Sequence, residues 1–251
     1  MTLLRVENIS KSFNTLQVLQ NITLEVQPGE RHVIIGPNGA GKTTLFNCIT
    51  SQLALNSGEV FLEDVEISKL TPNKLVHLGM GRTFQKNNLF GNLTVKENLH
   101  LALTALKPYR YKLFKPLFSY SDLKKETEEI IEQWKITDRQ DVIVNNLSYG
   151  EQRLLEVLLA LASKPKILLL DEPTSGMSPA ETVQTSEMIQ KLPRSVALLV
   201  IEHDMDVVFS IADRITVIHH GEVILSGTPE EVRNNDTVKQ IYFGGGARAN
   251  D

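Results

Sequence analysis

The sequence has little of what would mark an unusual class of protein. Of its 251 residues a single one is cysteine, Cys48. One cysteine forms no internal disulfide and no thiolate metal cluster, so nothing points to an oxidising compartment. No run approaches the roughly 18 to 20 apolar residues of a membrane span, and the polar start MTLLRVENISKSF does not resemble a signal peptide. We expect a cytosolic chain that reaches a membrane only through a partner.

An excess of positive charge is also missing. The chain has 26 Lys and Arg against 30 Asp and Glu, a net charge of -4. A general binder of nucleic acid needs clustered basic residues to neutralise phosphates, so the acidic balance argues against that class. It does not exclude a nucleotide pocket. With 41% hydrophobic and 22% charged residues, the chain suffices for one large α/β domain, with or without an inserted subdomain.

Short apolar runs and a helical middle predict the architecture. Strands are expected at 20–26, 32–35, 59–63, 167–170, 197–201 and 214–218. Helical periodicity runs from about 92 to 164, and helical segments lie between the last three strands. A mainly parallel, doubly wound sheet is the natural assembly. We expect one domain, with a nucleotide-binding core at 1–85 and 165–240, a helical subdomain at 86–164 and a C-terminal tail at 241–251, whose glycine-rich part, 243–251, is expected to be loose.

A glycine-rich loop follows the second strand. Its residues match G-x-x-x-x-G-K-[ST] and are Gly36, Pro37, Asn38, Gly39, Ala40, Gly41, Lys42, Thr43 and Thr44. Glycines let backbone N–H groups turn inward around a phosphate chain, Lys42 supplies a point charge, and the Thr43 hydroxyl can ligate Mg²⁺. An incidental glycine turn would need neither the strand before it nor the helix after it. The loop therefore predicts a nucleoside triphosphate site.

Two acidic residues follow the strand at 167–170. Ligands bind at the carboxyl ends of strands in open α/β sheets, so Asp171 and Glu172 are expected near the glycine-rich loop. Asp171 can hold the Mg²⁺ that Thr43 also serves, and Glu172 can orient or deprotonate an attacking water. Two solvated charges at a sheet edge are the plainer alternative. A base beside a phosphate loop favours hydrolysis over phosphoryl transfer to a substrate.

The segment LSYGEQ, Leu147–Gln152, has two interpretations. Ser148 and Glu151 form the S-x-x-E pattern of a capping box, opening an apolar helix from about Glu151 to Ala162. That does not explain Gly150, which costs helix stability and permits close approach to a ligand. With the loop and the acidic pair, the segment resembles the signature of the ATP-binding cassette (ABC) ATPases. In that family the signature contacts the γ-phosphate held by the other subunit.

The resemblance extends to three further positions. Phe13 resembles the aromatic residue that stacks on adenine, Gln85 the glutamine that senses Mg²⁺ and the attacking water, and His203 the switch histidine at the γ-phosphate. The resemblance implies catalytic roles for Glu172, His203 and Gln85 and Mg²⁺ ligation by Thr43, Gln85 and Asp171. It assigns ATP binding to Phe13, to residues 36–44 and, from a second subunit, to Ser148, Gly150 and Glu151.

The family also implies a fold and partners. The fold would be a P-loop ATPase core with an antiparallel β subdomain and an inserted α-helical subdomain. ATP and Mg²⁺ would be the cofactors. The partners would be a second ATPase subunit, transmembrane permease subunits and, indirectly, an external solute-binding protein, with the chain peripheral on the cytoplasmic face of the cell membrane. Three departures stand out: Tyr149 replaces a commoner glycine, Ser178 an aspartate and Phe13 a tyrosine.

Within the family the chain resembles the branched-chain amino-acid importer ATPases. The segments that carry this likeness are 81–99, 147–152, 201–208 and 227–244. Relatives of that branch handle amino acids, amides, urea or small carboxylates, so the solute stays open, as does homodimer against heterodimer. The competing interpretations are a lipid or lipopolysaccharide exporter ATPase, a soluble ABC protein acting on nucleic acid, and a regulator that binds nucleotide without turnover.

Overall fold

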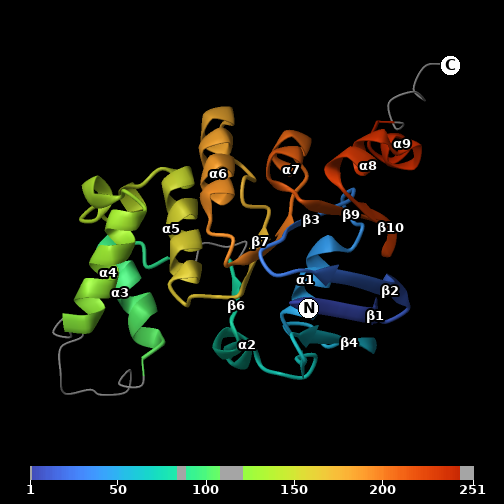
Figure 1. Ribbon diagram of the computed structural model, residues 1–251, viewed down its shortest axis with the longest axis horizontal. Helices are drawn as coiled ribbons and strands as arrows, with labels where there is room; N and C mark the ends of the chain where they lie inside the picture. Colours follow the sequence, from blue (N-terminus) through green and yellow to red (C-terminus); the bar gives the residue numbers. More distant parts are fainter. Residues whose placement is uncertain (1, 84–88, 108–120, 244–251) are drawn as a thin grey trace. The chain divides into compact units, whose positions relative to one another are not determined.

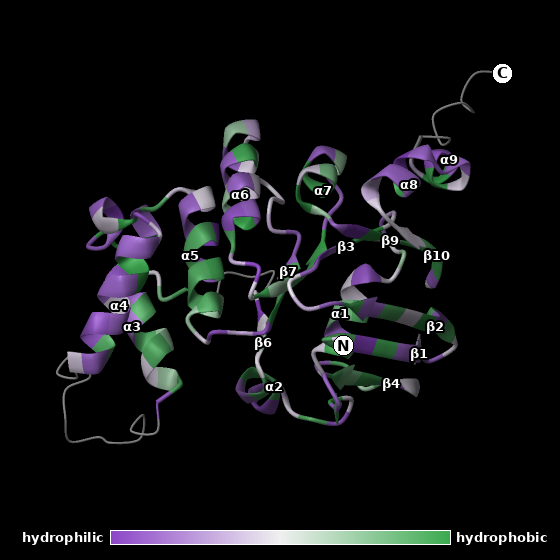
Figure 2. Ribbon diagram, viewed as in Figure 1, coloured by the Kyte–Doolittle hydropathy of each residue, from purple (hydrophilic) through white to green (hydrophobic). Residues whose placement is uncertain are grey.

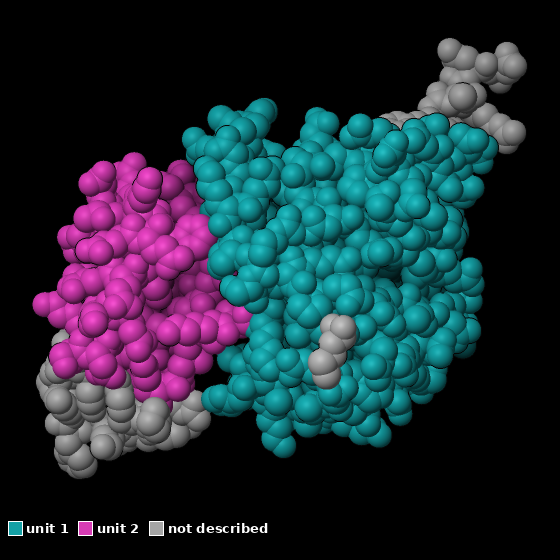
Figure 3. Space-filling view, in the orientation of Figure 1, with its two compact units in different colours: residues 1–80, 166–251 teal, residues 81–165 magenta. Residues whose placement is uncertain are grey.

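The computed structural model describes residues 2–83, 89–107 and 121–243, and its ribbon is shown in Figure 1. In chain order the elements are β1 (Leu4–Phe13), β2 (Leu16–Val26), β3 (Arg31–Ile35), α1 (Lys42–Ile49), β4 (Ser57–Leu62), β5 (Val65–Glu66), α2 (Pro72–Leu78), β6 (Met80–Arg82), α3 (Val95–Ala105), α4 (Ser121–Gln133), α5 (Tyr149–Leu161), β7 (Ile167–Asp171), α6 (Pro179–Lys191), β8 (Ala197–Ile201), α7 (Met205–Ile211), β9 (Arg214–His219), β10 (Glu222–Gly227), α8 (Pro229–Asn234) and α9 (Asp236–Phe243). The chain divides into two compact units, 1–80 with 166–251, and 81–165 (Figure 3).

The first unit is built around a six-stranded sheet. Its strand order is β10-β9-β3-β8-β7-β6, and the β3–β8, β3–β9 and β7–β8 pairs are parallel. Every residue of β3, β7 and β8 is buried. Strands that are covered on both faces are typically near-continuous runs of apolar residues, as in these three strands. The predicted mainly parallel sheet is confirmed.

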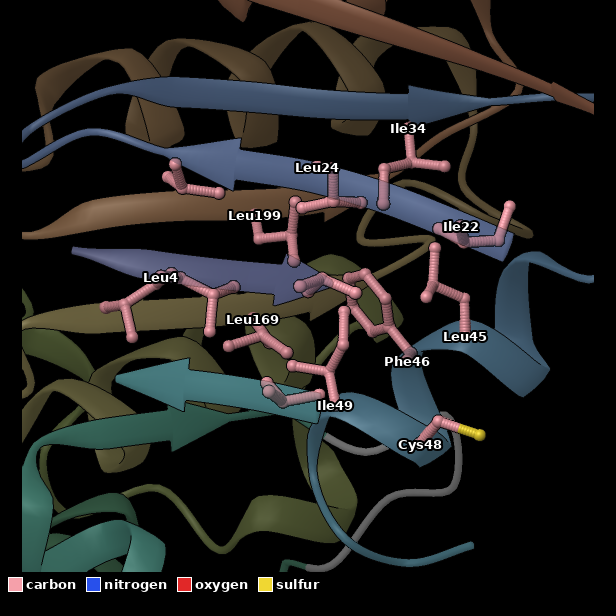
Figure 4. Close-up of a cluster of buried hydrophobic side chains, with 14 of the residues drawn as sticks. Leu4, Ile22, Leu24, Ile34, Leu45, Phe46, Cys48, Ile49, Leu169 and Leu199 are labelled. Atoms are coloured by element: carbon pink, nitrogen blue, oxygen red, sulfur yellow. The ribbon is translucent and has the colours of Figure 1, made fainter. Parts of the chain in front are cut away.

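A second, four-stranded sheet in the same unit is antiparallel, with the order β2-β1-β4-β5. The sequence pattern predicts only parts of β2 and β4 and does not indicate β1. Helix α1 packs with strands of both sheets in one apolar cluster, and Figure 4 shows Phe46 and Ile49 of α1 among leucines and isoleucines of β1, β2, β3, β7 and β8. Cys48 is 1% exposed in the same cluster, so its side chain serves packing.

The second unit is helical. It contains α3, α4 and α5 around an apolar core that includes Leu99, Ile131 and Leu158. Figure 2 shows α4 as mostly hydrophilic along its length, which fits its exposed Glu and Lys side chains. Helical structure was expected throughout 92–164, but between α4 and α5 the chain forms only the short 3-10 turns Thr137–Arg139 and Val144–Asn146. Within the described ranges, no helix is long and apolar enough to cross a bilayer.

A buried histidine in β3 makes the stability of the first unit depend on pH. His32 is 1% exposed, and its Nε2 lies 2.7 Å from Thr216 Oγ1 on β9. Burial, with a smaller contribution from the charge of Arg214, lowers the pKa of His32 from 6.5 to about 4. Between those values the unfolded chain binds a proton that the folded chain does not. The free energy of unfolding therefore falls as the pH drops from about 6.5 to about 4.

We expect His32→Gln to remove this slope. At about 1.36 kcal/mol per pH unit, the wild type should lose up to about 3 kcal/mol more than the variant between pH 7 and pH 4. Urea unfolding of both proteins at a series of pH values measures the difference directly. Carboxylates titrate equally in both proteins and cancel in the comparison. Parallel pH profiles would contradict the assignment of a neutral His32.

Candidate functional site

Strand register brings three loops to one edge of the six-stranded sheet. Ile34 of β3 pairs with Ile201 of β8, and Ile201 pairs with Asp171 of β7. The three strands are parallel neighbours, so the segments that follow them leave the sheet side by side. These segments are the glycine-rich loop 36–41, the acidic loop 172–178 and the histidine turn 202–204. The sheet thus assembles the predicted phosphate, acid and histidine elements at one place.

At two of its glycines, the glycine-rich loop packs too tightly for a side chain. A Cβ on Gly36 would lie 2.3 Å from the Ile218 carbonyl oxygen. Gly41 has φ +100°, and a Cβ there would lie 2.8 Å from Leu19 Cδ2. The positive φ strains any other residue, so glycine is required at this position. Gly41 is also the N-cap of α1. The N–H groups of the first turn of α1 and the positive end of its helix dipole therefore face the loop.

Strand β2 and the turn between β9 and β10 brace the loop. The N–H of Gly221 in that turn donates to the Ala40 carbonyl at 3.1 Å, and the N–H of Gln20 donates to the Gly221 carbonyl at 2.8 Å. A Cβ on Gly221 would lie 2.3 Å from the Val18 carbonyl oxygen. The loop is therefore bonded to the turn between β9 and β10 of one sheet and, through that turn, to β2 of the other.

Lys42 is the first residue of α1 and is 6% exposed. Its ammonium donates to the carbonyl oxygens of Gly36 at 2.6 Å and Pro37 at 3.1 Å. Burial lowers the pKa of Lys42, while the charges of Glu172 and Asp171 act in the opposite direction. The ammonium is thus held at the loop within electrostatic reach of the predicted carboxylates.

The two carboxylates differ in their surroundings. Asp171 ends β7 and is 1% exposed, whereas Glu172 is half-buried. Glu172 has φ +46°, a left-handed conformation that is costly for a residue with a side chain and recurs at functional sites. Its N–H donates to the carbonyl of Ile201, the last residue of β8, at 3.0 Å, so the backbone bonding to β8 continues one residue beyond the end of β7. The backbone therefore turns sharply at the residue predicted to act as base.

Of the remaining predicted residues, His203 and Phe13 are accessible in this unit, and Gln85 cannot be placed. The side chain of His203 is 55% exposed, just beyond the end of β8. Phe13 ends β1 and is 43% exposed, with Lys11 Nζ 5.2 Å from the centre of its ring. An exposed ring can stack on a base, and this exposure is not that of a core phenylalanine. Gln85 lies outside the described residues.

The signature segment begins helix α5 in the second unit. Ser148 is the N-cap: its Oγ accepts from the Glu151 N–H at 3.3 Å, and Glu151 Oε2 accepts from the Ser148 N–H at 2.8 Å. Glu151 also forms a 2.8 Å ion pair with Arg139. The predicted capping box is confirmed. Accepting one bond leaves the Ser148 hydroxyl its own hydrogen to donate, so the cap is compatible with the predicted contact to a phosphate in trans.

Ser178, the departure in the acidic loop, also has a structural use. It is the N-cap of α6, where its Oγ accepts from the Glu181 N–H at 3.4 Å and Glu181 Oε2 accepts from the Ser178 N–H at 3.0 Å. Glu202 also belongs to the site, although no motif in the sequence indicates it. This carboxylate is 0% exposed and directly precedes His203. A charged residue at the end of an apolar strand was the available signal.

Known proteins resemble this chain over nearly its whole length. The profile of the family described as ABC transporter matches residues 19–175, and that of the branched-chain amino acid ATP-binding cassette transporter matches residues 222–248. The high-affinity branched-chain amino acid transport ATP-binding protein LivG of Escherichia coli K12 is 36% identical, across 96% of this chain and 98% of its own. The lipopolysaccharide export system ATP-binding protein LptB of Haemophilus influenzae is 31% identical, across 97% and 98%.

Two solved structures share the fold. The ADP conformation of an ATP-binding cassette of an ABC transporter is 31% identical with a TM-score of 0.84, across 97% of this chain and 99% of its own. A dimeric post-hydrolysis state of another ATP-binding cassette, bound to ADP and Pi, is 26% identical with a TM-score of 0.73, across 90% and 98%. The coverage extends over both compact units.

Proposed function

Because this chain belongs to the ABC transporter family of ATP-binding proteins, we propose that it hydrolyses ATP as one of a pair of subunits and thereby powers the import of branched-chain amino acids or related small polar solutes. The family membership agrees with the resemblance drawn from the motifs. The observation that carries the proposed site is the strand register, which sets the phosphate loop, the Asp171–Glu172 pair and His203 at one sheet edge.

In the proposed reaction the loop amides and the α1 N-terminus hold the phosphate chain of ATP. Lys42 adds its ammonium to the β- and γ-phosphates, and Phe13 stacks on the adenine. Glu172 accepts the proton of the attacking water, and His203 donates a hydrogen bond to the γ-phosphate. Gln85 is proposed to align the same water. Loss of the γ-phosphate removes the contacts that hold the pair closed.

Mg²⁺ fits the proposed site by the chemistry of its donors. Asp171 offers a buried carboxylate and Thr43 an exposed hydroxyl on the first turn of α1, and such hard oxygen donors suit Mg²⁺. Among the described residues there is no group of three or more His, Cys, Asp or Glu side chains that could hold a metal ion. Mg²⁺ characteristically uses few protein ligands together with phosphate oxygens and water. Gln85 is proposed as a third ligand. When bound, the ion neutralises developing phosphate charge.

The signature segment, 147–152, is the basis for proposing that two subunits pair. Ser148, Gly150 and Glu151 of one subunit are proposed to meet the γ-phosphate held by the other, so that one chain contributes two different half-sites. The relative solved as a dimer with ADP and Pi supports the proposal of a pair. In these roles we propose 1–85 with 165–240 as the nucleotide-binding core and 86–164 as the helical subdomain that presents the signature. The first three residues of the expected tail, 241–251, belong to α9, and the rest lie outside the described residues.

We expect Ser148→Ala in both subunits to weaken ATP-dependent pairing by about 100-fold, because one hydrogen bond to a charged phosphate is lost at each of two sites, each worth about 1.5 kcal/mol or more. The pairing is measured by size-exclusion chromatography in a Glu172→Gln background, where ATP persists. Loss of the cap itself costs about 1 kcal/mol of stability.

Thr94→Ala is the matched control for this experiment. Thr94 caps α3 in the same unit with the same reciprocal bonds, here to Glu97. Its loss should cost similar stability and leave pairing unchanged. If the Ser148 and Thr94 variants pair equally well with ATP, Ser148 does not contact the nucleotide.

The membrane role rests on the relatives. We place the chain peripherally on the cytoplasmic face of the cell membrane, bound to permease subunits that receive solute from an external binding protein. A lipopolysaccharide exporter is the alternative, and its named relative has the lower identity. Binding of nucleic acid is not part of the proposal. Co-purification from membranes, followed by ATP hydrolysis with leucine or a lipid substrate present, separates importer from exporter.

A further inference from the structure

A fully buried carboxylate lies between the two loops that carry the proposed catalytic groups. Glu202 directly follows β8 and is 0% exposed. Its Oε1 accepts from the N–H of Thr174 at 3.2 Å and also from the Thr174 hydroxyl. Its Oε2 accepts from the N–H groups of His203 at 2.8 Å and Asp204 at 3.3 Å. Each oxygen thus serves two donors, which uses the four acceptor positions of a carboxylate.

Glu202 therefore connects segments that are distant in the sequence. Thr174 belongs to the loop that begins at Glu172, whereas the N–H groups of His203 and Asp204 belong to the turn after β8. The backbone N–H of Glu202 also donates to the Ile34 carbonyl at 3.3 Å, one residue from the end of β3. One residue thus contacts the acidic loop, the histidine turn and the strand that leads into the phosphate loop.

The acidic loop has a specific need for such a contact. Glu172 is held in a left-handed conformation, which costs on the order of 1 to 3 kcal/mol and persists only where the surroundings enforce it. On its N-terminal side, the bond from its own N–H to the Ile201 carbonyl fixes it to β8. On its C-terminal side, the two bonds from Thr174 to Glu202 fix the loop to the residue after Ile201. The strained position is thus anchored to β8 from both sides.

We propose that Glu202 is a positioning residue for ATP hydrolysis, which sets the separation of Glu172 and His203 through its bonds to Thr174 and to the histidine turn. The proposal rests on the catalytic roles proposed above for Glu172 and His203. Glu202 is buried and its oxygens accept from protein donors, so we assign it no contact with the nucleotide. It acts on the rate of the chemical step, whereas the phosphate loop and Phe13 govern ATP affinity.

The pair Thr174→Val and Thr174→Ser separates hydrogen bonding from packing. Valine keeps the volume of the buried threonine and removes the hydroxyl donor to Glu202, while serine keeps the donor and removes a methyl group. If the bond positions the loop, Thr174→Val lowers kcat by on the order of tenfold and Thr174→Ser stays within about twofold of the wild type. A packing role predicts the opposite order.

Glu202→Gln tests the carboxylate itself. A glutamine oxygen can serve one pair of donors, but its NH₂ group then faces the other pair. We expect kcat to fall on the order of 10- to 100-fold, as for a displaced catalytic group, with the KM for ATP within about twofold. Glu231→Gln is the matched control, because Glu231 accepts from the N–H and hydroxyl of Thr228 in the same way on α8. It should leave kcat unchanged.

Three results would overturn the proposal: wild-type kcat in both Glu202→Gln and Thr174→Val, an equal fall of kcat in Glu231→Gln, or a rise in KM that accounts for the whole effect. If Glu202→Gln does not fold, as judged by thermal unfolding, the threonine pair decides. Glu172→Gln is measured alongside. If Glu172→Gln loses hydrolysis while the Glu202 and Thr174 variants keep normal rates, only the positioning role is rejected. If Glu172→Gln hydrolyses ATP normally, the proposed site itself is rejected.

Discussion

Replacing Glu172 with glutamine is expected to lower the rate of ATP hydrolysis by about 10²- to 10⁴-fold, the contribution typical of a positioned general base. Glutamine has almost the same shape and keeps the backbone bond from residue 172 to the Ile201 carbonyl, but its amide cannot accept the proton of the attacking water. ATP should still bind, because Lys42 and the loop amides are unchanged. The variant should accumulate as an ATP-bound pair.

Two measurements check this expectation. Phosphate release gives the rate, and size-exclusion chromatography with ATP or ADP shows the pair with ATP alone. Glu187→Gln is the matched control, since Glu187 is an exposed carboxylate on α6 in the same unit and forms an ion pair with Lys191. It should hydrolyse ATP normally. Hydrolysis by Glu172→Gln within tenfold of the wild type would assign the base to another residue.

Replacing Lys42 with alanine is expected to weaken ATP binding by about 10- to 100-fold. A hydrogen bond to a charged group is worth about 1.5 to 3 kcal/mol, and each 1.4 kcal/mol changes the dissociation constant tenfold. The ammonium is already held at the loop by the carbonyls of Gly36 and Pro37 and needs little reorganisation to meet phosphate oxygens. Calorimetric titration of ATP gives the affinity.

Two variants test whether the effect of Lys42 comes from its charge. Lys42→Met keeps most of the buried stem and removes the ammonium, so it should bind ATP as weakly as Lys42→Ala. Lys69→Ala removes an exposed lysine from the same unit and should bind like the wild type. ATP binding by Lys42→Met with wild-type affinity would show that the stem, and not the ammonium, is what matters.

The parts of the fold that sequence analysis predicted are those with uninterrupted patterns. The runs that became β3, β7 and β8 are continuous and apolar because both faces of these strands are buried. Strand β1 was missed because its alternation is broken: its pairing with β2 shifts register between Val6 and Ile9, and Asn8 there has φ +48°. A bulge moves later side chains to the other face, and a two-residue period no longer describes the strand.

The candidate site was predictable where a motif contains its own chemistry. The glycine-rich loop and the capping pattern of Ser148 and Glu151 describe local geometry, which a short segment determines by itself. Glu202 was missed because its partners are the hydroxyl and N–H of Thr174, 28 residues earlier in the chain. That contact depends on β7 and β8 being neighbours, which strand patterns alone do not specify.

The brace behind the phosphate loop gives the protein a remote reporter. The Gly221 amide is hydrogen-bonded to the Ala40 carbonyl, and no motif assigns Gly221 a contact with ATP. When nucleotide stiffens the loop, opening of this bond becomes rarer, and exchange of the Gly221 amide proton with deuterated solvent should slow with it. A spectroscopic probe in the turn between β9 and β10 can therefore follow nucleotide binding at the loop without a change to any residue proposed to contact ATP.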